Sequence, residues 1–143
     1  IGVATAADLM ADACVRISEL IDRNVLNLVD PDISKGLPTN LRVGPYDHAK
    51  GIHQLLSSLH QRVKSLQTPS AQMSFSCEGN NQDVVPCGMN AQNQVSDLLD
   101  LLQESLKAGL FCAYRGAYQR LGEPMPARFR LNNWENTTYE SFI

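Results

Sequence analysis

The sequence predicts an all-α protein built as a bundle of long helices. Apolar residues recur every three or four positions through three long segments, which is the spacing of a helix with one buried face. No stretch shows the strict alternation of a strand, and no repeat, phosphate-binding loop or low-complexity run occurs. We therefore expect three long helices and one structured polar loop, forming one wall of a larger helical bundle.

The first helix is expected from about Thr5 to Leu28. Asp30-Pro31-Asp32 ends it, because proline disfavours a helical conformation in the residue before it. Its buried stripe is predicted to consist of Leu9, Ala13, Ile17, Leu20, Ile21, Val25 and Leu28.

The second helix is expected to begin near Gly44-Pro45, since proline favours the first turn of a helix, and to continue to about Leu66. Lys50 lies off the apolar stripe of this helix, so composition alone predicts that its side chain faces solvent. The stripe consists of Ala49, Ile52, Leu55, Leu56, Leu59, Val63 and Leu66.

The third helix is expected from about Met89 to Leu121. A helix of about 30 residues is ~45 Å long, more than the width of a compact domain of this size, so we expect another chain to cover part of its apolar surface. Residues 122–143 are predicted to form an irregular tail, and the whole chain, 1–143, is taken as a single helical segment. The predicted stripe is Val95, Leu98, Leu99, Leu102, Leu106, Leu110, Ala113, Ala117 and Leu121.

Charge and composition exclude several classes of partner. The net charge is −3 and the pI is near 5.5, whereas nucleic acids and anionic membranes require a basic face. No apolar run approaches the ~20 residues of a membrane span, and no secretory signal is visible, so we expect a cytoplasmic protein. The sequence begins at Ile1 and not at Met, which favours a piece of a longer protein.

The cysteines and histidines do not form a recognisable metal site. The four cysteines form no Cys-x-x-Cys pair, and His53 and His60 share a helix face without a third ligand nearby. We expect reduced, unligated cysteines, with Cys14 and Cys112 acting as small core residues.

Ser74 to Gly88 is unusually rich in polar side chains for a connector between helices. Asn80, Asn81 and Gln82 each offer N–H donors and a carbonyl acceptor, while the carboxylates Glu78 and Asp83 offer acceptors. Such a set could hold the ammonium and carboxylate groups of an amino acid. Composition alone favours a plain turn that caps the following helix.

Glu78-Gly79-Asn80-Asn81-Gln82-Asp83 resembles the Glu-x-x-Asn-Gln-Asp segment of the aromatic amino acid ammonia-lyases and aminomutases, the superfamily of phenylalanine, tyrosine and histidine ammonia-lyases. Three further motifs are similar to that family, in its order and spacing. They are Ser18-Glu19-Leu20, the turn Gly36-Leu37-Pro38-Thr39-Asn40-Leu41, and Asp47-His48-Ala49-Lys50-Gly51. The resemblance covers roughly residues 16 to 120 and corresponds to the C-terminal part of the family's core.

The resemblance implies a part of an elongated helical subunit that assembles as a homotetramer. It also implies the prosthetic group 4-methylidene-imidazol-5-one (MIO), which the family forms from an Ala-Ser-Gly tripeptide in the first half of the subunit. This chain contains no Ala-Ser-Gly, so the group would form outside it. We therefore expect the chain to be inactive alone and to supply pocket residues to the longer enzyme.

By resemblance, Gln82 and Glu78 match catalytic positions, and Asn81 and Lys50 match substrate-binding positions, with Lys50 expected to approach Glu78. Histidine-type enzymes carry a glutamate at the position of Gln82, so the glutamine favours phenylalanine or tyrosine as substrate. Pro86-Cys87 departs from the family's pattern at the start of the third helix.

Two functions remain open from the sequence. The first is a part of an ammonia-lyase or a 2,3-aminomutase, two activities that this stretch does not separate. The second is a non-catalytic helical assembly module that has kept the family scaffold.

Overall fold

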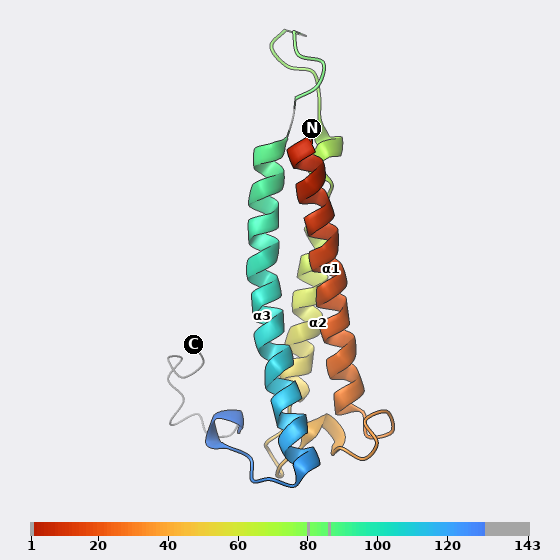
Figure 1. Ribbon diagram of the computed structural model, residues 1–143, viewed down its shortest axis with the longest axis vertical. Helices are drawn as coiled ribbons and strands as arrows, with labels where there is room; N and C mark the ends of the chain where they lie inside the picture. Colours follow the sequence, from red (N-terminus) through yellow and green to blue (C-terminus); the bar gives the residue numbers. More distant parts are fainter. Residues whose placement is uncertain (1, 80, 86, 131–143) are drawn as a thin grey trace. The chain divides into compact units, whose positions relative to one another are not determined.

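The computed structural model describes residues 2–79, 81–85 and 87–130. Figure 1 traces the long helices in chain order, from α1 in red through α2 to α3, which ends in blue. They are α1 (Gly2–Val29), α2 (Lys50–Ser65) and α3 (Gly88–Leu121), with short 3-10 helices η1 (Thr39–Leu41), η2 (Ser70–Met73) and η3 (Ala127–Phe129). Within the described residues there is no strand, which confirms the all-α prediction.

The start of α2 differs from the prediction. The helix begins at Lys50 and not near Gly44-Pro45. Residues before it form a turn, in which the Val43 N–H donates to the Asp47 carbonyl at 2.9 Å and the Ala49 N–H donates to the Asn40 carbonyl at 2.8 Å. Because these bonds occupy the backbone groups that a helical ladder would use, the helix cannot begin earlier.

The chain divides into two compact units. Unit 1 contains Ile1–Leu20 and Ser58–Ser105, and unit 2 contains Ile21–Ser57 and Leu106–Ile143. Of the expected irregular tail, residues 131–143 lie outside the described part, and the described part includes η3.

In unit 1, the buried face of α1 carries small side chains. The predicted stripe is wrong here, because Leu9, Ile17 and Leu20 are 68%, 43% and 59% exposed. This part of α1 has apolar residues on two faces, and the face with the smaller side chains allows closer packing. Its buried members are Ala4, Ala7, Ala11, Cys14, Val15 and Ser18.

The core of unit 1 is completed by α2 and α3. Val63 of α2 is fully buried, as the stripe of that helix predicts. From α3, the buried residues are Ala91, Val95, Leu98 and Leu102, and the first part of the predicted stripe is thereby largely confirmed. Leu99 is the exception, because its side chain is 45% exposed.

In unit 2, the predicted stripe of α3 is wrong beyond Leu102. Leu106, Leu110 and Leu121 are exposed, and so are Ala113 and Ala117. The buried face instead consists of Gly109, Cys112, Arg115 and Gly116, of which Gly109 is partly exposed.

Glycine explains this choice of face. A Cβ atom at Gly109 would lie 2.6 Å from Cγ2 of Ile21, and one at Gly116 would lie 3.5 Å from both Leu28 and Leu37. Neighbouring side chains therefore approach the backbone of α3 closely, and the larger leucines point elsewhere. The core built on this face comprises Val25, Val29, Leu37, Leu41, Ala49, Leu56 and Cys112.

Polar side chains also join the elements of unit 1. In unit 1, the carboxylate of Asp8 accepts hydrogen bonds from the N–H groups of Ser70 and Ala71, at 2.8 and 2.9 Å, and so caps η2. Gln67 donates to Asp12 at 2.7 Å in the same unit.

Among the residues that the structure describes, no helix combines the length and apolarity needed to cross a bilayer.

Candidate functional site

The amide-rich segment folds as a small hairpin in unit 1. The Cys77 N–H donates to the Gln82 carbonyl at 3.1 Å, and the Gln82 N–H donates to the Cys77 carbonyl at 3.3 Å. The turn between them is closed by a bond of 3.2 Å from the Asn81 N–H to the Glu78 carbonyl. This arrangement brings Glu78, Asn81 and Gln82 together at one hairpin tip, and their role as a shared site stays a prediction.

Glu78 has a left-handed backbone, with φ of 53°, and Gly79 follows with φ of 63°. A side chain in this region costs roughly 1–2 kcal/mol. Glycine adopts it without that cost, whereas Glu78 does so only because the hairpin holds it there. Residues held in this way cluster at binding and catalytic sites, so the conformation of Glu78 supports a functional interpretation of the hairpin.

The side chains of Glu78, Asn81 and Gln82 are exposed. Within the described residues, none of the three makes a side-chain hydrogen bond, so their donors and acceptors face outward. Asn80 lies outside the described residues. An exposed set of one carboxylate and two amides at a fixed turn suits recognition of a ligand with both an ammonium and a carboxylate.

Ser74, and not Asp83, holds the base of the hairpin. The hydroxyl of Ser74 accepts a hydrogen bond of 2.9 Å from the Val85 N–H. Asp83 is exposed, and across the described ranges its carboxylate contacts no backbone donor. Both residues offer acceptors in the polar segment, and the only sequence signal for Ser74 is its place at the start of that segment.

Lys50 lies in unit 2, whereas the hairpin belongs to unit 1, so the predicted pair of Lys50 with Glu78 stays a prediction. Lys50 is the first residue of α2 and is exposed. It lines a cavity of about 240 Å³ whose other lining residues are Thr39, Asn40, Arg42, Pro45 and His48. Arg42 and Lys50 give this cavity a basic character.

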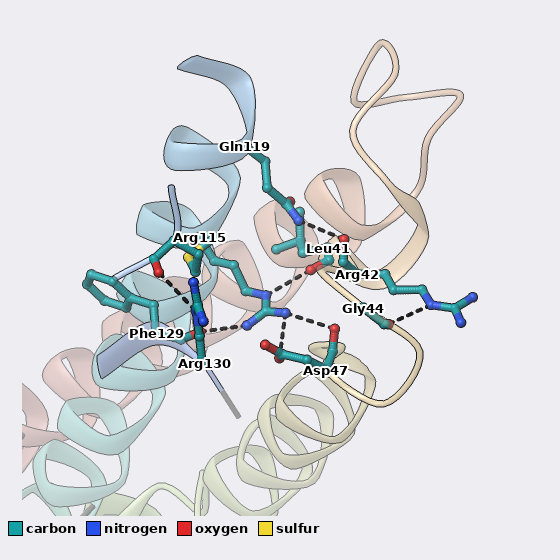
Figure 2. A network of polar contacts seen from close by, with 9 residues as sticks. Leu41, Arg42, Gly44, Asp47, Arg115, Gln119, Phe129 and Arg130 are labelled. Atoms are coloured by element: carbon teal, nitrogen blue, oxygen red, sulfur yellow. Dashed lines mark hydrogen bonds and ion pairs between the residues drawn. The ribbon is translucent and has the colours of Figure 1, made fainter. Parts of the chain in front are cut away.

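Beneath the segment that leads to Lys50 lies Arg115, which the sequence did not single out. Its side chain is fully buried and forms an ion pair of 2.6 Å with Asp47. Figure 2 shows its guanidinium directed at the carbonyls of Leu41, Asp47 and Phe129, with bonds of 2.8, 2.9 and 2.6 Å. Arginine is rarely buried, so composition predicts an exposed side chain; the available signal was its position three residues after Cys112 on one helix face.

No metal centre is found among the described residues, where no three histidine, cysteine, aspartate or glutamate side chains gather. Cys14 and Cys112 are both buried and unpaired with other cysteines, which confirms their predicted place in the core.

The three long helices, with no strand among the described residues, place the chain in the all-α class. The sequence profile described as "Aromatic amino acid lyase" matches residues 2–133, so the chain belongs to the aromatic amino acid lyase family. Histidine ammonia-lyase of Geobacillus thermodenitrificans is 28% identical over 120 residues, covering 82% of this chain and 24% of the relative. Tyrosine 2,3-aminomutase of Myxococcus fulvus is 28% identical over 142 residues, covering 87% of this chain and 27% of the relative.

Solved structures agree with this family. Phenylalanine aminomutase of Pantoea agglomerans superposes with a TM-score of 0.80 at 25% identity, covering 89% of this chain and 25% of that one. Tyrosine aminomutase from Streptomyces globisporus shares the fold, with a TM-score of 0.76 at 23% identity, over 82% of this chain and 23% of that one. The chain therefore spans about a quarter of the length of the proteins that it matches.

Proposed function

We propose that this chain supplies part of the active-site wall of an ammonia-lyase or 2,3-aminomutase that acts on phenylalanine or tyrosine. The observation that carries the proposal is the hairpin tip, where Glu78, Asn81 and Gln82 expose their side chains from a turn held by paired backbone bonds. The glutamine at position 82 supports phenylalanine or tyrosine as the substrate, because the histidine-type enzymes carry glutamate there.

Each hairpin residue has a distinct role in this proposal. The amide of Gln82 donates a hydrogen bond to developing negative charge and accepts one from an ammonium group, so it acts on the reacting end of the substrate. The carboxylate of Glu78 sits near the substrate's amino group and attracts its positive charge. Asn81 orients the substrate beside Gln82, and Lys50 keeps its predicted role in substrate binding.

The family's prosthetic group, 4-methylidene-imidazol-5-one, supplies an electrophile when present, and in this proposal it forms in a part of the polypeptide outside this chain. The hairpin fits a place beside such a group. Within the described residues the amide of Gln82 is exposed and not engaged in another bond, so it has the donor capacity to bind a polar heterocycle.

Because the chain spans about a quarter of its relatives, the activity belongs to the longer protein, which we place in the cytoplasm as a homotetramer. The alternative is a helical assembly module without chemistry. The exposed leucines of α3 favour a role in assembly, but an assembly scaffold alone does not require a glutamate with a left-handed backbone at the hairpin tip.

The test is an assay of the longer protein with phenylalanine, tyrosine and histidine separately. Ammonia release with an arylacrylate product identifies a lyase, and a β-amino acid product identifies an aminomutase. The 143-residue chain serves as the control and is expected to form neither product. A longer protein that neither binds nor converts any of the three amino acids would support the assembly module instead.

A further inference from the structure

We propose that Arg115 is a positioning residue that holds Lys50 and its cavity in the geometry needed for substrate binding; this inference rests on the proposed function of Lys50. Arg115 does not line the cavity. It acts through the segment between Leu41 and Asp47, which leads into α2 and Lys50.

Arg115 holds both ends of this segment. Its Nε donates to the Leu41 carbonyl at 2.8 Å, and its Nη2 donates to the Asp47 carbonyl at 2.9 Å and to Asp47 Oδ1 at 2.6 Å. Two residues that line the cavity, Asn40 and Arg42, are the sequence neighbours of Leu41. A third lining residue, His48, follows Asp47 directly, so the bonds of one guanidinium fix the wall of the cavity at two places.

The backbone at Leu41 needs such support. Asn40 and Leu41 have φ of 54° and 52°, in the left-handed region that leucine seldom adopts. The Leu41 carbonyl therefore points in a direction set by an unfavourable backbone conformation. A buried donor at this carbonyl keeps it there, and Gln119 adds a bond of 3.0 Å to the carbonyl of Arg42.

The positive charge of Arg115 is paired with the carboxylate of Asp47. The side chains of Arg115 and Asp47 are 0% and 3% exposed, so each charge is removed from water and the pair compensates both. A guanidinium presents its donors as a rigid planar fork, which lets one side chain bond Leu41 and Asp47 at once. Lysine carries the same charge but lacks the planar fork. Substitution of Arg115 by lysine therefore separates the effect of the charge from the effect of the fork geometry.

A role limited to stability predicts different kinetics from a role through Lys50. The experiment uses the longer enzyme and compares Asp47→Asn, Lys50→Met and the double variant, with kcat, KM and melting temperature measured for each. Asp30→Asn is the matched control, since the carboxylate of Asp30 accepts a bond of 2.9 Å from the Asp32 N–H in the same unit, away from the cavity.

We expect Asp47→Asn to lower kcat/KM by about 10-fold, mainly through KM, because displacement of a binding group lowers the productive fraction. In the Lys50→Met background the same change is expected to have less than about a twofold effect, since the group being positioned is gone. Equal losses in both backgrounds overturn the inference and leave the proposed function standing. Unchanged kcat/KM in Lys50→Met overturns the inference together with the role of Lys50.

Arg115→Lys covers the case in which Asp47→Asn does not fold. It keeps the buried charge pair but replaces the planar fork of donors by a single ammonium centre, so we expect a raised KM with a folded enzyme. A KM equal to that of the unmodified enzyme in Arg115→Lys overturns the inference. An enzyme that releases neither ammonia nor a β-amino acid overturns the proposed function and this inference with it.

Discussion

The hydroxyl of Ser57 donates a hydrogen bond of 2.7 Å to the carboxylate of Asp22, which joins α1 to α2 inside unit 2. Asp22 is almost completely buried, and Arg23 forms an ion pair with its second oxygen at 2.5 Å. His53 Nε2 lies 3.7 Å from the oxygen that Ser57 bonds. A buried carboxylate with these partners ties the stability of unit 2 to pH.

Unit 2 is expected to lose stability in acid. Burial by itself raises the pKa of Asp22, but the hydrogen bonds from Ser57 and Arg23 and the charges of Arg23 and His53 together lower this pKa below its ordinary value of 3.8. A carboxyl group whose pKa is lowered by folding stabilises the protein above its unfolded pKa, and this contribution disappears as the pH falls through the lowered value. Urea unfolding between neutral pH and strong acid should therefore show a steeper acid decline in the unmodified chain than in Asp22→Asn. Asp100→Asn, at an exposed position on α3, is the control and should keep the decline.

Two glycine substitutions should have opposite effects on stability. Gly109→Ala places a Cβ atom 2.6 Å from Cγ2 of Ile21, a β-branched side chain that cannot turn aside, so overpacking should cost roughly 1–3 kcal/mol. Gly51→Ala meets nothing within 4 Å in α2, and should stabilise by up to ~1 kcal/mol because alanine favours the helix. Urea unfolding of both variants measures the difference. A stabilising Gly109→Ala would contradict the close contact between α1 and α3 in unit 2.

The four cysteines should differ in reactivity with an alkylating reagent. Burial raises the pKa of the Cys112 thiol to about 11, with the Arg115 charge opposing this in part, and burial also raises the pKa of Cys14. The thiolate is the reactive form, so both should react slowly near neutral pH, after the half-buried Cys77 and Cys87. Mass spectrometry of alkylated peptides over time gives the order, and alkylation in urea is the control in which all four react. Cys112 modified as early as Cys77 would be inconsistent with the described core.

The sequence predicts the helices better than the faces they bury. The bounds of α1 and α3 are close to the prediction, because apolar periodicity and proline positions mark the ends of a helix locally. The buried face of α3 in unit 2 could not be predicted, since the spacing of Leu106 and Leu110 is as regular as that of Gly109, Cys112 and Gly116. Which face is buried depends on how closely α1 approaches α3. That approach is set by the contact of Gly109 with Ile21 of α1, which the sequence of α3 alone does not reveal.

The candidate site shows the same division. The turn between Glu78 and Gln82 is formed by residues close in sequence, so a local motif was enough to single out the hairpin as a candidate site. Arg115 was missed, because its four hydrogen bonds go to residues at least 14 positions away in the sequence. Three of these bonds go to backbone carbonyls, which every residue type provides, so no sequence pattern marks them. Its role follows only from the fold of unit 2.

The exposed apolar side chains predict self-association of the isolated chain. Leu106, Leu110 and Leu121 of α3 are 44%, 55% and 73% exposed, and burying a leucine is worth about 1.5–3 kcal/mol. Light scattering at micromolar concentration should therefore return a mass above that of one chain. Replacing Leu106 and Leu110 together by glutamine should lower the mass, whereas Gln103→Asn, an exposed polar position of α3, should not. A strictly monomeric unmodified chain would contradict the prediction.

The final prediction separates turnover from stability at the hairpin. In the longer enzyme, Gln82→Ala removes a donor that we place at the reacting end of the substrate, so kcat should fall by roughly 10- to 1000-fold. Glu78→Gln keeps the size of the side chain and removes its charge, so it should change KM and the preference among amino acids more than melting temperature. Ser74→Ala removes the acceptor of the Val85 N–H and should cost ~1 kcal/mol of stability at unchanged kcat per folded molecule.

Kinetics and thermal unfolding measured side by side on the three variants decide between a pocket and a plain turn. Gln82 and Glu78 make no side-chain hydrogen bond within the described residues, so a structural role gives their substitution little reason to change melting temperature. Ser74 is the matched control, because its contribution to the hairpin is a bond of 2.9 Å at the base, away from the tip. If Gln82→Ala retains full kcat, the hairpin tip does not contact the reacting substrate, and the assignment of Gln82 to the pocket is wrong.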